Sequence, residues 1–94
     1  MELEFTRHAI EKMDARHVSE SDAHLALEDP DSMFYDKEWE TLVVVKSIRN
    51  RYLVILYTHK NGKYRIVTVY FSAKIDKLIN SKIRRGAWVK IEKE

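Results

Sequence analysis

Three consecutive β-rich runs, joined by short polar breaks, restrict the fold of this chain more than any other feature. Residues 41–48 (TLVVVKSI) are rich in β-branched side chains, and residues 52–58 (YLVILYT) are apolar at nearly every position. Residues 64–71 (YRIVTVYF) alternate, with Ile66, Thr68 and Tyr70 on one face and Arg65 on the other. The Asn61-Gly62 pair between the last two runs favours a tight hairpin. These runs predict an antiparallel sheet whose central strand, 52–58, is covered on both faces.

Two helices are predicted before this sheet. Thr6 is a suitable N-cap for a helix over residues 7–16, where Ala9, Ile10 and Met13 form the inner stripe. Ser19 begins a capping-box pattern for a second helix over residues 20–28. Pro30 ends that helix, because proline lacks the amide donor and restricts the residue before it.

Shorter elements complete the predicted order. Ser72 can cap a third helix with apolar Ile75, Leu78, Ile79 and Ile83, and Gly86 ends it. Residues 2–5 and 33–35 predict short strands, the second at a sheet edge, and residues 87–93 form a final strand or a docked tail. We therefore predict one α+β domain over residues 1–94. Two N-terminal helices pack on a twisted antiparallel sheet of three to four strands, a C-terminal helix follows, and the helices share one face.

A net charge of +2 conceals a division along the chain. Residues 1–40 carry four basic and twelve acidic residues (4 − 12 = −8), and residues 41–94 carry thirteen and three (13 − 3 = +10). The basic half interleaves its cations with the aromatic residues Tyr52, Tyr57, Tyr64, Tyr70 and Phe71. Cations and aromatic rings on a sheet are typical of RNA binding. A solvated cationic face, with the aromatic rings in the core, is the alternative that the sequence leaves open.

Composition argues against several other classes of function. The chain has no Cys, which removes disulfides, zinc ribbons and thiol nucleophiles. His8, His17, His24 and His59 lack the spacing of a metal-binding helix, and the acidic residues of 28–40 predict a solvated loop. No apolar run approaches the length of a membrane helix, and the first residues are acidic where a signal peptide is basic. We expect a cytoplasmic protein with no metal, no cofactor and no membrane partner.

Two segments carry a family resemblance. Residues 5–18 (FTRHAIEKMDARHV) resemble a motif of His-Ala, a charged residue, Met, and Arg before Val or Ile, and residues 66–70 (IVTVY) resemble its late strand. With the Asp-Pro after the second helix, the chain resembles the domain of unknown function 4258 family over about residues 4–75. That family is similar in arrangement to the RelE/ParE/BrnT toxin superfamily, which implies a RelE-like α+β domain with two helices on an antiparallel sheet. The superfamily includes messenger-RNA endoribonucleases and members that poison gyrase instead.

The resemblance implies a site for metal-independent RNA cleavage, in which a 2′-hydroxyl attacks the adjacent phosphate. His8 is assigned to proton transfer, and Tyr70 to base stacking or a share of the proton transfer. Lys74 and Arg16 are assigned to phosphate. The further predicted RNA contacts are Thr68, Arg49, Arg51, Arg65 and Lys77. Structural roles remain open, with His8 tying the first helix to the sheet and Thr68 and Tyr70 as core β-formers.

One departure weakens the resemblance to the nucleases. Residues 88–93 contain no Tyr or His, whereas RelE-like nucleases often place a catalytic aromatic near the C-terminus. Three hypotheses follow. The first is a toxin-like endoribonuclease with RNA as substrate and a cognate antitoxin as partner. The others are a non-catalytic module that binds nucleic acid or protein, and a scaffold such as a homodimer in which the acidic and basic halves attract.

Overall fold

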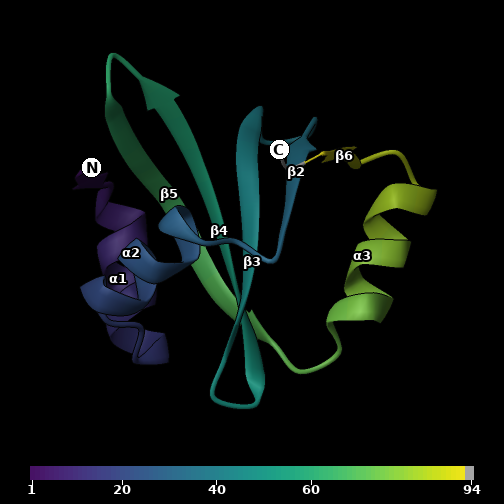
Figure 1. Ribbon diagram of the computed structural model, residues 1–94, viewed down its shortest axis with the longest axis horizontal. Coiled ribbons are helices and arrows are strands. Elements are labelled where there is room, and N and C mark those ends of the chain that lie inside the picture. Colours follow the sequence, from purple (N-terminus) through teal and green to yellow (C-terminus); the bar gives the residue numbers. More distant parts are fainter. Residues whose placement is uncertain (93–94) are drawn as a thin grey trace.

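A mixed β-sheet organises residues 1–92, the part of the chain that the computed structural model describes. The elements are β1 (Glu2–Phe5), α1 (Arg7–Arg16), α2 (Glu20–Glu28), β2 (Ser32–Asp36), β3 (Thr41–Ile48), β4 (Arg51–Lys60), β5 (Lys63–Ser72), α3 (Ile75–Arg84) and β6 (Trp88–Ile91). The strands lie in the order β1-β5-β4-β3-β2-β6 (Figure 1). Each of the three β-rich runs therefore forms a strand, and β4 lies inside the sheet as predicted.

The prediction of three to four antiparallel strands is wrong, because residues 1–92 form a six-stranded mixed sheet. β1 pairs parallel to β5, with Phe5 opposite Ile66, and β6 pairs antiparallel to β2, with Trp88 opposite Asp36. The strand β2 is therefore not an edge strand. Both added strands are four residues long. Alternation over so few residues predicts a strand but not its partner, and the parallel pair joins segments about sixty residues apart in the sequence.

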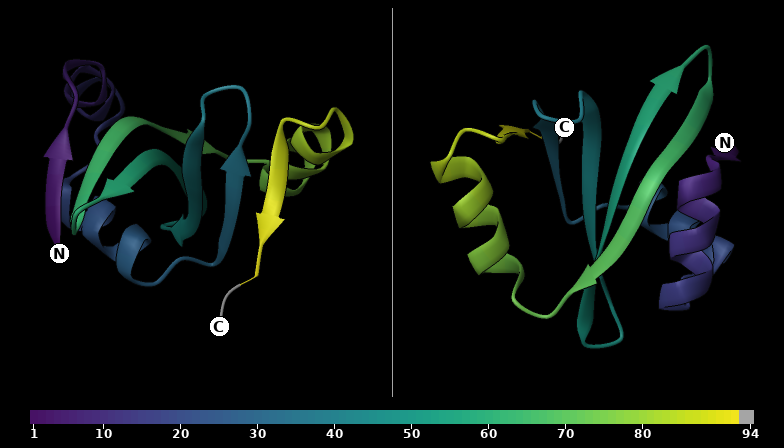
Figure 2. Two further views of the ribbon diagram at one scale, coloured as in Figure 1. Left: turned by 90° about the horizontal axis from the view of Figure 1, so that it is seen from above. Right: turned by 180° about the vertical axis from the view of Figure 1, so that it is seen from behind.

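The helices cover both faces of the sheet, so the prediction that they share one face is also wrong (Figures 1 and 2). α1 and α2 pack on one face, where Ala9 and Ala26 contact a cluster that includes Ile55. α3 packs on the other face, where Ile75 joins a cluster that includes Val54. Neighbouring residues of β4 point to opposite faces, and both are fully buried. A strand that is apolar on both faces needs a helix on each side, which is why α3 crosses over.

Helix caps and turns follow the sequence in most places. The Thr6 hydroxyl accepts from the Ala9 amide at 3.0 Å, and the Ser19 hydroxyl accepts from the Asp22 amide at 3.0 Å, which confirms both N-caps. The predicted cap at Ser72 is wrong, because α3 begins at Ile75 without a side-chain cap. Residues 87–93 contain the strand β6, while Lys93 lies outside the described residues. Within residues 1–92, the helices are too short and too polar to cross a membrane.

A β-bulge in β5 decides which of its side chains reach each face. Thr68 lies opposite Leu56, but Ile66 lies opposite Tyr57, so β5 has one extra residue at Val67. As a result Ile66 and Val69 both join the core under α1 and α2. The prediction that Ile66 and Thr68 share a face is therefore wrong, because strict alternation does not account for an inserted residue. The bulge turns Thr68 toward the opposite face, together with Tyr70.

Candidate functional site

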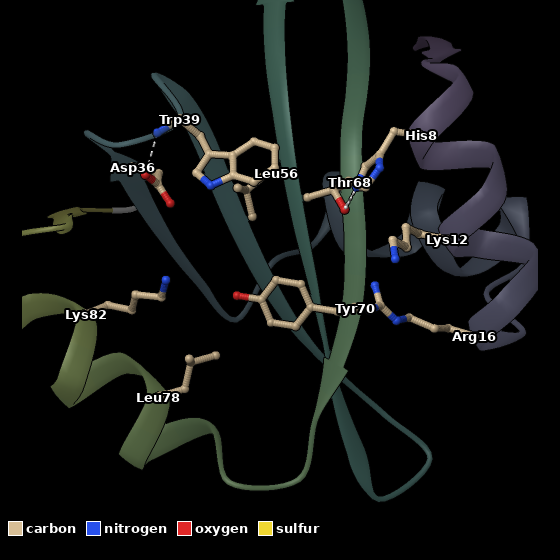
Figure 3. A pocket seen from close by; sticks show the side chains of 10 residues that line it. All are labelled: His8, Lys12, Arg16, Asp36, Trp39, Leu56, Thr68, Tyr70, Leu78 and Lys82. Carbon is tan, nitrogen blue, oxygen red and sulfur yellow. Dashed lines mark hydrogen bonds between the residues drawn. The ribbon is translucent and has the colours of Figure 1, made fainter.

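A cleft of about 410 Å³ lies between α1 and α3, over the part of the sheet formed by β4 and β5 (Figure 3). Its lining comes from both helices, from three strands and from the turn between β2 and β3. The lining residues are His8, Lys12, Arg16, Asp36, Trp39, Leu56, Thr68, Tyr70, Leu78 and Lys82.

One wall of the cleft is a polar stripe of α1. His8, Lys12 and Arg16 follow one another at four-residue spacing, which places them on one side of the helix. All three point toward β5 (Figure 3). Ala9 and Met13 form the buried stripe, whereas Ile10 is 58% exposed, so its predicted place in the core is wrong. α1 thus presents its apolar side to the core and a cationic side to the cleft.

α1 is fixed to β5 through side-chain bonds to the sheet. β1 pairs with β5 only as far as Ile66, which leaves the following stretch of that edge without a strand neighbour. The Thr6 hydroxyl donates to the Val67 carbonyl at 3.1 Å, and Arg16 Nη1 donates to the Val69 carbonyl at 2.7 Å. α1 therefore satisfies edge carbonyls of the sheet, and its polar stripe is held beside the cleft floor.

His8 and Thr68 form a hydrogen-bonded pair at the α1 side of the floor. His8 Nε2 lies 3.0 Å from the Thr68 hydroxyl oxygen. Thr68 is buried, while His8 is exposed. In the tautomer that donates its Nε2 proton to Thr68, the other ring nitrogen, Nδ1, carries a lone pair. In that tautomer the pair orients an imidazole whose Nδ1 can accept a proton.

Tyr70 occupies the middle of the floor, with its hydroxyl directed toward α3 (Figure 3). Burial raises the pKa of Tyr70, the nearby Asp36 carboxylate adds to the increase, and Arg16 opposes it, which brings the pKa to about 12. The phenol is therefore neutral at physiological pH. It can donate a hydrogen bond or a proton to a ligand, but it cannot act as a base.

Asp36 lies in the cleft lining but acts as a structural carboxylate. It is 1% exposed, so the prediction that residues 28–40 form a solvated acidic loop is wrong at this position. Its Oδ1 accepts from the amides of Glu38 at 2.8 Å and Trp39 at 2.9 Å. Its Oδ2 accepts from Nε1 of the buried Trp88 at 2.9 Å. The carboxylate joins the β2–β3 turn to β6, and it holds Trp39 at the edge of the cleft.

The cleft carries a positive charge that its own residues do not neutralise. Lys12, Arg16 and Lys82 contribute three positive charges against the carboxylate of Asp36, so the lining has a net charge of 3 − 1 = +2 with His8 neutral. No ion pair joins these three cations to a carboxylate of residues 1–92. In the same range, no three His, Asp or Glu side chains gather closely enough to hold a metal ion. The arrangement suits an anionic ligand such as a phosphate.

The structure brings some of the predicted site residues together. His8, Arg16, Thr68 and Tyr70 all line the cleft, although they come from two ends of the sequence. Lys74 does not line it and lies exposed at the N-terminus of α3, because the helix begins later than Ser72 suggests.

The other predicted RNA contacts lie elsewhere. Arg49 donates to Asp22 on α2 at 3.0 Å, and the guanidinium of Arg51 lies 3.9 Å from the centre of the Phe71 ring. Arg65 borders a separate hollow near the β4–β5 turn, and Lys77 borders another along α3. These four predicted cations therefore lie outside the cleft, and they do not gather at one place.

Sequence reasoning did not select Lys12, Asp36, Trp39 or Lys82. Four-residue spacing from His8 to Lys12 to Arg16 is a signal that identifies Lys12 once Arg7–Arg16 is read as a helix. Asp36 and Trp39 carry no such signal, because the β2–β3 turn is far from the other cleft residues in the sequence and only the folded chain brings them together. Lys82 reaches it because α3 covers the face opposite α1 and α2.

A known protein family covers most of the chain. The family described as Domain of unknown function (DUF4258) matches residues 5–71. The chain belongs to this family. The match to DUF4258 contains the α1, β4 and β5 walls of the cleft, whereas Leu78 and Lys82 of α3 lie outside it. No curated protein and no solved structure matches the chain.

Proposed function

We propose that this DUF4258 protein is a metal-independent endoribonuclease, and that the cleft between α1 and α3 is its active site. The observation that carries the proposal is the set of chemical groups that line this one cleft. An imidazole, a neutral phenol and three cations without ion-pair partners among residues 1–92 line the same cleft. These are the groups that phosphodiester cleavage by a neighbouring hydroxyl requires.

The proposed reaction transfers one proton at each end of a phosphoryl transfer. His8 Nδ1 accepts the proton of the 2′-hydroxyl as that oxygen forms a bond to phosphorus. The bond from phosphorus to the 5′-oxygen breaks, and the Tyr70 hydroxyl donates a proton to that leaving oxygen. The products are a 2′,3′-cyclic phosphate and a 5′-hydroxyl. Water then returns a proton to Tyr70 and removes one from His8, so the charges balance.

Cations of the cleft stabilise the charge that develops on the phosphate. Lys12 and Arg16 approach from α1, and Lys82 approaches from α3 (Figure 3). In the reaction Lys82 takes the role that sequence reasoning gave to Lys74. Positive groups fixed around a developing negative charge contribute more than mobile ones, because they need no reorganisation during the step.

We also propose a toxin role for this nuclease, which follows from the similarity in arrangement that we expect between the DUF4258 family and the RelE/ParE/BrnT toxins. A cognate antitoxin would neutralise the enzyme most directly by placing acidic side chains over the cleft cations. We expect expression of the wild-type protein to slow cell growth, and the His8→Ala variant to relieve the effect. Undiminished growth at high expression of the folded protein would contradict the toxin role.

Cleavage of a single-stranded RNA, with a chelator present, tests the proposed function. We expect the wild-type protein to produce cyclic-phosphate ends, and His8→Ala to lower the rate by roughly 100-fold or more. His24→Ala is the matched control, because His24 lies on α2 away from the cleft. A wild-type protein that leaves the RNA intact would overturn the proposal, as would equal rates for the two variants.

A second candidate is RNA binding without cleavage. The bonds from His8 to Thr68 and from Arg16 to the Val69 carbonyl favour it, because each also serves to hold α1 against β5. The same experiment separates the two candidates. Binding that persists while no product forms would support the binding module.

A further inference from the structure

An exposed tryptophan at the edge of the cleft has no role in the core. Trp39 is 52% exposed and belongs to neither core cluster. Its ring centre lies 6.5 Å from that of His8, at an interplanar angle of 38°. Trp39 and His8 therefore lie close together in the lining of the same cleft (Figure 3).

Several bonds fix the turn that carries Trp39. The amides of Glu38 and Trp39 donate to Asp36, which is itself buried and bonded to Trp88. The Lys37 amide donates to the Ala87 carbonyl at 2.8 Å. The turn also carries an ion pair from Glu38 to Arg85 of 2.9 Å. An exposed ring on an anchored turn loses little further freedom when it stacks on a ligand.

Charge around the turn distinguishes the two ends of a bound nucleotide. Glu38 is paired with Arg85, whereas Glu40 adds an exposed negative charge to the end of the turn next to Trp39, so phosphate is disfavoured there. Lys12 and Arg16 lie on α1, where phosphate is favoured. These charges favour a bound nucleotide with its phosphate near the cleft cations and its uncharged base near the β2–β3 turn.

From these observations we propose that Trp39 is a base-stacking subsite, and that the cleft takes single-stranded RNA with an unpaired base next to the bound phosphate. The inference rests on the proposed function and adds the substrate class. Base stacking on an aromatic side chain tolerates any base, because every base presents a flat π-face. A base inside a duplex is already stacked and paired, so a duplex cannot use the subsite.

Binding of a 2′-O-methyl oligoadenylate tests the subsite apart from catalysis, because this probe lacks the attacking hydroxyl. We expect Trp39→Leu to weaken its binding by about 5- to 100-fold. Binding of an abasic oligomer with the same backbone should change less than about twofold, since it contains no base to stack. Tyr35→Leu is the matched control, because Tyr35 is an exposed aromatic residue outside the cleft.

Fluorescence gives a second readout of the same contact. The chain has two tryptophans, and Trp88 is 2% exposed, so quenching by the oligoadenylate should come from Trp39 and vanish in Trp39→Phe. Loss of binding that is equal for the two probes, an unaffected Trp39→Leu, or no binding to the wild type would each overturn the subsite. Base-dependent quenching by a protein that cleaves no RNA would uphold the subsite and overturn only the proposed catalysis.

Discussion

The cations that line the cleft contact different groups from the cations elsewhere in the molecule. Away from the cleft, Arg49 pairs with Asp22 at 3.0 Å and Lys46 with Asp29 at 3.1 Å. Lys63 lies 3.6 Å from Glu4. In the cleft, Arg16 bonds to a backbone carbonyl, and Lys82 lies 5.8 Å from the centre of the Trp88 ring.

Pairing within the molecule accounts for part of the charge division of the sequence. Among residues 41–92, four cations (Lys46, Arg49, Lys63 and Arg85) pair with acidic residues from the first forty. A cation paired within the molecule is a poor ligand for phosphate, because binding would first have to break that pair. The candidate site is marked by cations without ion-pair partners that lie beside an imidazole and a phenol, rather than by the total charge.

The largest expected effect concerns Asp36, the carboxylate that lines the cleft. Asp36→Ala removes three hydrogen bonds and leaves the buried Trp88 indole without an acceptor, so we expect a loss of about 3–4 kcal/mol in the free energy of unfolding. Urea denaturation measures it. Glu38→Ala, in the same turn, removes an exposed ion pair and should cost less than about 1 kcal/mol. Equal losses would show that Asp36 is not structural.

The next effect compares the two sets of cations directly. Lys12→Gln with Lys82→Gln should weaken binding of the 2′-O-methyl oligoadenylate by roughly 10- to 100-fold. The salt slope should fall by about 1.4, because each cation that neutralises a phosphate of a single strand contributes about 0.7 to it. Arg49→Gln with Arg51→Gln should leave the slope unchanged, since both side chains have internal partners. Binding titrations at several salt concentrations decide it. A larger change in the salt slope for Arg49→Gln with Arg51→Gln than for Lys12→Gln with Lys82→Gln would contradict the placement of the RNA site in the cleft.

A smaller effect tests the paired region alone. A hydrogen bond from Arg49 lowers the pKa of Asp22, against a smaller opposing effect of burial. A lowered pKa in the folded state stabilises the fold above the unfolded pKa of about 3.9, and this contribution is lost as pH falls through the folded value. Arg49→Gln should therefore reduce stability at neutral pH by up to about 1 kcal/mol. The difference from wild type, measured by urea denaturation, should shrink below about pH 4. A difference that grows with acid would contradict the pairing.

The smallest effect concerns the acidic side of the cleft mouth. Glu40→Gln removes one exposed negative charge beside Trp39, so RNA affinity should rise by roughly twofold at low salt. Glu28→Gln, on α2, is the control, and the same binding titration measures both. A fall in affinity for Glu40→Gln would mean that this carboxylate contacts the ligand favourably.

Local features of the fold could be predicted from the sequence, because they depend on residues near one another. The helices at 7–16 and 20–28 and their caps at Thr6 and Ser19 follow from spacing and from short side chains that reach nearby amides. The parallel pairing of β1, the position of β6 and the bulge at Val67 could not, because each depends on contacts between distant segments.

The residues of the candidate site also divide into those that the sequence predicts and those that only the fold brings to the cleft. His8, Arg16, Thr68 and Tyr70 lie in motifs that a family resemblance can carry. Trp39 and Lys82 reach the cleft only because the β2–β3 turn and α3 fold over the same face of the sheet. Arg49 and Lys46 are of residue types that often contact RNA. Only the fold shows that each is paired with a carboxylate of the same chain.

Mapping of the bound RNA by NMR tests the central claim most directly. Backbone and side-chain shifts of the wild-type protein would be followed during titration with the 2′-O-methyl oligoadenylate. We predict that the largest changes fall on Lys12, Trp39, Thr68, Tyr70 and Lys82, and that Arg49 and Arg51 change little. Changes concentrated around Arg49 and Arg51, with the cleft unaffected, would contradict the assignment of the cleft as the RNA site.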